Sequence, residues 1–103
     1  MTIYDAIDEF KRTRPFSLVS AQAFLDTLAP MVQEQFVAGI YIGKDHMHKS
    51  TLIPGDEVSR FYTDHIPRDK YAEVLAKHGD EAIIHLEKMV QCAEASQFDL
   101  RNL

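Results

Sequence analysis

The sequence predicts an all-α protein, a compact bundle of five or six short helices. Apolar residues recur mainly at intervals of three and four, which is the period of a helix. The 103 residues, of which 46% are apolar, are enough for one hydrophobic core but not for two. We therefore expect a single helical domain over residues 1–103. Short segments are separated by Pro15, Pro30, Pro54-Gly55, Pro67 and Gly79.

The first two helices are predicted from the residues that can cap them. Thr2 can begin a helix that ends near Arg14, because the residue before Pro15 disfavours the helical region. Ser17 or Ser20 can begin the second. The apolar faces are expected to be Ile3, Ile7 and Phe10 in the first helix, and Ala21, Phe24, Leu25 and Leu28 in the second.

The next segment, residues 30–43, permits two interpretations. Pro30 fits the first position of a helix, and Phe36 and Ile40 keep the four-residue spacing. Residues 36–42 are also an apolar run rich in strand-forming residues, so an α+β fold with one short strand there is the alternative. A helix through Gly39 costs about 1 kcal/mol relative to alanine, which burial of apolar side chains can offset. We expect the helix.

The second half of the chain predicts a polar loop over residues 46–55 and then three helices. Asp56 can cap the first of them, Pro67 can start the second, and Gly79 can supply a left-handed residue at its end. Asp80 can cap the last and longest helix. The helix after Asp56 is expected to have an apolar stripe of Val58, Phe61, Tyr62 and Ile66, and the helix after Pro67 one of Tyr71, Val74, Leu75 and His78. The stripe expected in the last helix is Ala82, Ile83, Leu86, Met89, Val90 and Ala93.

Composition excludes several classes of function. The net charge is −5 and the basic residues are dispersed, whereas phosphate binding needs a coherent positive surface, so the composition argues against nucleic acid as the partner. The longest apolar run, residues 36–42, is far shorter than the about 20 residues of a membrane span. Acidic residues near the start are unlike a signal peptide, and the single cysteine, Cys92, cannot form an internal disulfide. We expect a cytoplasmic protein.

Histidines are the first candidates for chemistry. His46 and His48 lie beside Asp45, which could suggest a metal site. A transition metal needs three or four converging ligands, and this loop offers neither a cysteine partner nor a His-Glu-x-x-His helix. We therefore expect no metal and no cofactor, and we expect both histidines to be exposed to solvent.

A small enzyme with a histidine and carboxylate site is one alternative. Glu81 and His85 stand four residues apart on the last helix and could form an acid–base pair, although a surface ion pair is the commoner outcome. Cys92 follows His85 by seven residues on the flank of the same helix. A lone cysteine in a helix usually packs as a small apolar residue.

A nucleic-acid-binding regulator is another alternative, because residues 58–77 resemble a helix-turn-helix unit in their pattern. The second helix would have to face the major groove, yet its charges are mixed and it has no Asn, Gln, Ser or Thr for base edges. An αα-hairpin that packs into the core is the preferred interpretation.

By elimination, the sequence favours a small non-enzymatic regulatory or inhibitor-type protein that acts by binding another protein. Ile84 is expected to project from the last helix opposite its apolar stripe, with Glu87, Lys88 and Gln91 around it. These four residues are the candidate partner-binding site. Two-fold pairing into a homodimer through the same face is a further expectation.

Overall fold

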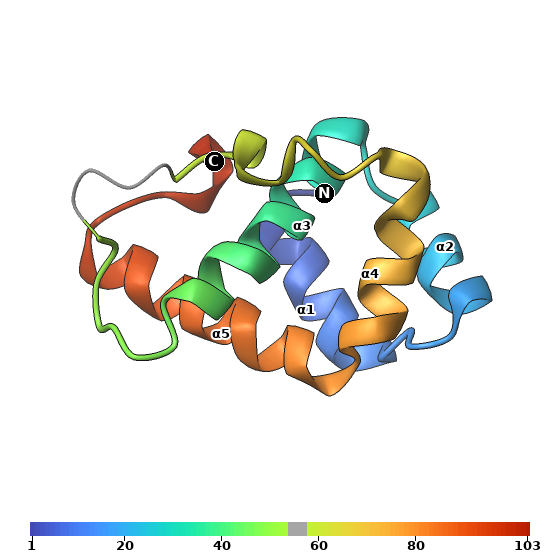
Figure 1. Ribbon diagram of the computed structural model, residues 1–103, viewed down its shortest axis with the longest axis horizontal. Coiled ribbons are helices and arrows are strands. Elements are labelled where there is room, and N and C mark those ends of the chain that lie inside the picture. Colours follow the sequence, from blue (N-terminus) through green and yellow to red (C-terminus); the bar gives the residue numbers. More distant parts are fainter. Residues whose placement is uncertain (54–57) are drawn as a thin grey trace.

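The chain is all-helical over the residues that the structure describes, 1–53 and 58–103 (Figure 1). The computed structural model contains no strand in those residues, which confirms the predicted fold class. None of the described helices has the length and apolar character that a membrane crossing requires. The α-helices are α1 (Ile3–Thr13), α2 (Leu18–Asp26), α3 (Pro30–Asp45), α4 (Tyr71–His78) and α5 (Asp80–Ala95), and the 3₁₀ turns are η1 (Arg60–Thr63), η2 (Arg68–Lys70) and η3 (Leu100–Asn102).

The first three helices begin where the local sequence predicts. The Thr2 hydroxyl accepts a hydrogen bond from the backbone N–H of Asp5, and the Asp5 carboxylate accepts one from the backbone N–H of Thr2. Such reciprocal bonds satisfy two amides that the helix cannot pair. Ser17 caps α2, and Pro30 occupies the first turn of α3, where its missing N–H loses no helical bond.

Helix α3 is continuous through residues 36–42, so the alternative of a strand there is wrong. All residues from 36 to 40 are buried, because α3 packs against α1, α5 and η1. A helix covered on several sides buries an uninterrupted apolar run, which on sequence alone resembles a buried strand. The helix also runs past Gly43, its predicted end, to Asp45.

Phenylalanines join the first three helices into one core. The Phe10 ring lies 5.2 Å from that of Phe36 and 5.4 Å from that of Phe24, measured between ring centroids. Phe16, in the connection between α1 and α2, adds a fourth ring at 5.7 Å from Phe10. Tilted and edge-to-face pairs at such distances contribute beyond the area that they bury. The predicted inward faces of α1 and α2 are confirmed by this packing.

From Val58 onward, where the structure describes the segment again, the helix that Asp56 was expected to cap is absent. In its place lies the single turn η1, in which Thr63 is buried and Phe61 is half exposed. Polar bonds hold η1 against α3: Arg60 forms an ion pair with Glu34 at 3.5 Å, and a hydrogen bond from the Tyr62 hydroxyl reaches Asp45. These contacts along α3 outweigh the helical period of the segment. Three positions, Pro54, Gly55 and the predicted cap Asp56, lie outside the described residues.

The last two helices differ from the prediction at their starts. Pro67 precedes the turn η2, and α4 begins only at Tyr71. Gly79 has the predicted positive φ of 53° but a ψ of −130°, and it alone separates α4 from α5. Asp80 does not cap α5, because it is the first residue of the helix and pairs instead with Arg14 at 3.1 Å.

Helix α5 lies very close to α3. A Cβ built on Gly43 would overlap the backbone carbonyl oxygen of His85 and would stand 2.7 Å from its carbonyl carbon. Only glycine allows the two backbones to approach in this way. The predicted stripe of α5 faces this contact: Ala82, Ile83, Leu86, Met89 and Ala93 are buried, and Val90 is partly buried.

Candidate functional site

The four predicted partner-binding residues lie on one outward face of α5, which we name the outer α5 face. Ile84 has 51% of its surface exposed. Glu87 and Gln91 are exposed and Lys88 is half-buried, so the isoleucine is set among polar side chains. Glu87 forms an ion pair with Lys11 of α1 at 3.7 Å, and the polar surroundings therefore extend onto a second helix.

Exposure alone does not single out Ile84. Val19, at the start of α2, is 83% exposed. Met31 and Phe61 are exposed to about the same degree as Ile84, on α3 and η1. Scattered apolar side chains are normal on protein surfaces. What distinguishes Ile84 is that it lies more than one turn from either end of α5, a helix whose opposite face is buried in the core.

A cluster of titratable rings, which the sequence did not reveal as a unit, lies where α3, α4 and α5 meet. Tyr41 belongs to α3, His78 ends α4, and His85 lies one turn into α5. The centroid of the His78 ring is 5.4 Å from that of Tyr41 and 6.2 Å from that of His85, with edge-on geometry in both pairs. His78 Nε2 and the Tyr41 hydroxyl are 3.4 Å apart. We name these three residues the corner cluster.

Burial lowers the pKa of both histidines in the corner cluster. For His78, burial is the largest cause, followed by the positive charge that His85 and then Lys44 would present. For His85, burial again dominates, Glu81 opposes the shift and Lys44 adds to it. The neutral rings are therefore favoured near neutral pH.

The predicted surface pair of Glu81 and His85 is wrong. His85 is only 9% exposed. Both residues lie in the described part of the chain, and no hydrogen bond or ion pair joins them, although the charge of Glu81 acts on the pKa of His85. The Nδ1 atom of His85 is buried and finds no hydrogen-bond partner among the described residues. Nothing near His85 in the sequence indicates this burial, because the ring beside it, His78, comes from α4 and its backbone lies against Gly43 of α3.

His46 is also buried, at 3% exposure, so the expectation that it is exposed to solvent is wrong. Its Nδ1 lies 2.7 Å from the carbonyl oxygen of Ile42, and its Nε2 accepts a hydrogen bond of 3.2 Å from the backbone N–H of Ile53. The ring therefore joins the end of α3 to the following loop. His48 is exposed, as predicted.

Cys92 is a buried thiol whose Sγ lies 3.7 Å from the carbonyl oxygen of Lys49. It faces the loop that follows α3, whereas His85 faces the corner cluster, so the two do not form a nucleophile and base. Among residues 1–53 and 58–103, no three His, Cys, Asp or Glu side chains are arranged to hold a metal ion.

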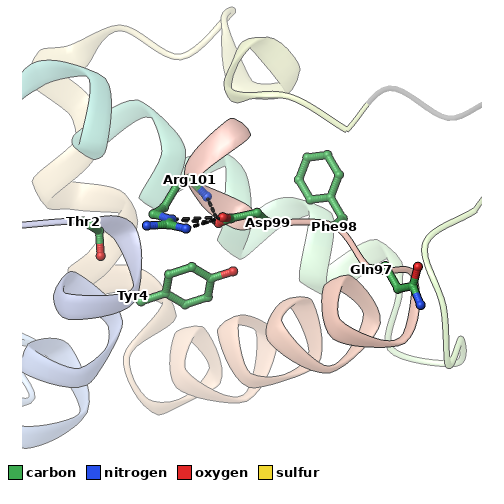
Figure 2. A pocket seen from close by; sticks show the side chains of 6 residues that line it. All are labelled: Thr2, Tyr4, Gln97, Phe98, Asp99 and Arg101. Carbon is green, nitrogen blue, oxygen red and sulfur yellow. Dashed lines mark hydrogen bonds and ion pairs between the residues drawn. The ribbon is translucent and has the colours of Figure 1, made fainter.

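A hollow of about 500 Å³ lies between the start of α1 and the C-terminal segment (Figure 2). Figure 2 shows Arg101 turned back onto Asp99, whose carboxylate accepts side-chain hydrogen bonds of 2.6 to 3.1 Å from it. These bonds lower the pKa of Asp99 to about 2. The Tyr4 hydroxyl accepts a bond of 2.9 Å from the Leu100 N–H. The polar groups that line this hollow are therefore hydrogen-bonded to one another, and the Tyr4–Leu100 bond joins the C-terminal segment to α1.

A second hollow, of about 330 Å³, is lined by charges that are also paired. Glu34 of α3 holds Arg68 at 2.6 Å and Arg60 at 3.5 Å. Two arginines from separate 3₁₀ turns thus converge on one carboxylate, and Asp64 lines the same hollow. Since the charges balance, the hollow has no clear preference for an anion.

Residues 58–77 form neither the αα-hairpin that the sequence favours nor the alternative helix-turn-helix unit, so both interpretations of this segment are wrong. In the first half of the segment lies the turn η1 rather than a helix. In its second half, α4 packs against α2 and buries Tyr71, Val74 and Leu75. The nucleic-acid alternative therefore loses the arrangement on which it depended.

Comparisons with known proteins provide no relative from which a function could be transferred. No protein-family model, curated protein or solved structure matches this chain. Its residues and their geometry are accordingly the basis for the proposals below.

Proposed function

We propose that this protein is a small non-enzymatic regulatory or inhibitor-type protein that binds another protein through the outer α5 face. The observation that supports this proposal is the half-exposed Ile84 in the middle of that face, surrounded by Glu87, Lys88 and Gln91. An apolar centre within a polar border is the usual composition of a protein interface.

The rest of α5 favours this role because it holds Ile84 in a fixed position. Ala82, Leu86 and Met89 are fully buried on the opposite side of the helix. The backbone contact between Gly43 and His85 places α5 directly on α3. A contact surface that is ordered before binding avoids much of the entropy cost of association.

The partner is expected to offer a shallow apolar recess to Ile84 and polar groups to its border. Glu87 is already balanced by Lys11, whereas no ion pair to Lys88 is described, so an acidic side chain opposite Lys88 would complement this face. A homodimer about a two-fold axis is one form of the proposal.

The same proposal includes a cytoplasmic location. Cys92 is a buried thiol that forms no disulfide, which is consistent with a reducing compartment.

The decisive variant is Ile84→Glu. Loss of an apolar anchor of this size costs about 1 to 3 kcal/mol, or roughly 5- to 150-fold in affinity. Sedimentation of the wild type over a range of concentrations tests the homodimer. For a different partner, the test is titration with a protein captured by the wild type from its native host. Circular dichroism must show that the variant keeps its helix content.

Val19→Glu is the matched control, because Val19 is exposed on α2, far along the chain from the outer α5 face. We expect it to leave association unchanged. The proposal is wrong if both variants bind equally well, if both lose binding equally, or if Ile84→Glu loses its helix content.

A small enzyme is the second candidate, supported by the corner cluster. Tyr41, His78 and His85 bring together groups that can exchange protons. The burial of His85 restricts access of a substrate, which ranks this candidate below protein binding. A histidine-modifying reagent followed by mass spectrometry separates the two: an accessible site requires His85 to react about as fast as the exposed His48.

A further inference from the structure

Helices α4 and α5 meet at a corner made by one residue, Gly79. Its φ of 53° and ψ of −130° are values that other residues rarely adopt. A Cβ built on Gly79 would meet no atom within 4 Å. Since no neighbouring atom packs against Gly79 at that position, the angle between the helices depends on contacts made on either side of it.

The two sides of the corner are held differently. On the α5 side, the backbone of His85 lies against Gly43 of α3, which leaves no room for a shift toward α3. On the other side, α4 packs mainly on α2 (Figure 1). Tyr41 and His78 provide a side-chain contact from α3 to the end of α4. The corner cluster therefore spans the hinge, with His78 immediately before Gly79 and His85 on the fixed side.

Positive charge outweighs negative charge around the corner cluster. Lys44 comes from α3 beside Tyr41, and Lys77 comes from α4 beside His78. The carboxylate of Glu81, on α5, opposes them, because its negative charge raises the pKa of both His78 and His85. If both rings, 6.2 Å apart, were protonated, they would repel each other and Lys44, and His78 would also be repelled by Lys77. Only the Glu81 carboxylate, of the groups that act on these rings, would attract them.

We propose that the corner cluster is a proton-sensitive latch, in which protonation of His78 and His85 releases the end of α4 from α3 and opens the corner at Gly79. This device goes beyond the proposed binding function and does not depend on it. The outer α5 face, by contrast, stays with α3, because the buried stripe of α5 packs along α3 on the other side of Gly79.

The direction of the pH effect follows from the lowered pKa of both histidines. An accessible histidine titrates near 6.5, so the open state binds protons more readily than the closed state. The latch is therefore fully effective above about pH 6.5 and weakens as the pH falls below it. Each unit of difference in pKa between the two states changes the opening equilibrium by about tenfold.

Hydrogen exchange of backbone amides, corrected for the intrinsic effect of pH, tests the proposal at about pH 7 and about pH 5. We expect protection of α4 to fall about tenfold or more at the lower pH, while α3 and α5 keep theirs. His78→Gln should reduce this dependence on pH, because glutamine does not titrate. His65→Gln, which changes an exposed histidine, should leave it unchanged.

Three results would overturn the proposal. Protection of α4 could be the same at both pH values, which would show that protons do not open the corner. All helices could lose protection together, which would be general acid unfolding. His78→Gln could retain the full dependence of the wild type, which would assign the effect to other groups.

Discussion

Replacement of Gly43 by alanine tests the closest contact in the fold. The added methyl group would overlap the carbonyl oxygen of His85 and would lie 2.7 Å from its carbonyl carbon and 3.3 Å from its Cα. These are backbone atoms of a packed helix, so they cannot rotate away as the end of a flexible side chain would. To admit the methyl group, α3 and α5 must move apart along the whole contact.

The size of the effect follows from two opposing contributions. Overpacking of a well-packed core usually costs about 1 to 3 kcal/mol and occasionally more. Alanine gains about 1 kcal/mol over glycine inside a helix. Because backbone atoms form the obstacle, we expect the cost to exceed the usual range and the net loss of unfolding free energy to be about 2 to 3 kcal/mol. For a domain of this size, such a loss lowers Tm by about 10 to 20 °C.

Gly39→Ala is the matched control on the same helix. Its new Cβ would meet the Leu86 side chain at 3.4 Å and that of Ile3 at 3.9 Å, which are ordinary contacts. We expect this variant to be as stable as the wild type or more stable by up to about 1 kcal/mol. Thermal and urea unfolding, followed by circular dichroism, measure both variants. Equal stability of the two would refute the interpretation that α3 and α5 are in backbone contact at Gly43.

Two further predictions concern buried and paired groups. His46→Ala should lower the unfolding free energy by about 2 to 4 kcal/mol, because it removes two hydrogen bonds and leaves a cavity. The control His48→Ala should change the unfolding free energy little. Urea unfolding measures both variants, and equal losses would contradict the hydrogen bonds assigned to His46. In Arg101→Gln, the pKa of Asp99 should rise from about 2 toward its usual 3.8 in an NMR titration, and an unchanged value would show that Arg101 is not the cause. The stability that this pair supplies is complete above about pH 3.8 and is lost as the pH falls toward about 2.

Local signals in the sequence determined where the first half of the chain forms helices. Thr2 and Ser17 cap their helices through bonds to residues three positions later, and Pro30 restricts its own backbone. The stripe of α5 and the exposure of Ile84 were predictable for a similar reason, since the period of a helix separates its faces. These features depend on residues within one or two turns of each other.

Tertiary structure alone decided the features that depend on remote residues. The segment 58–66 has a helical pattern, yet it lies along α3 as the turn η1 because Glu34 and Asp45 hold it there. The corner cluster required α3, α4 and α5 to converge, and no spacing in the sequence relates Tyr41 to His85. Periodicity indicates which face of a helix is apolar, but contacts between distant segments decide what covers that face and which polar groups are buried with it.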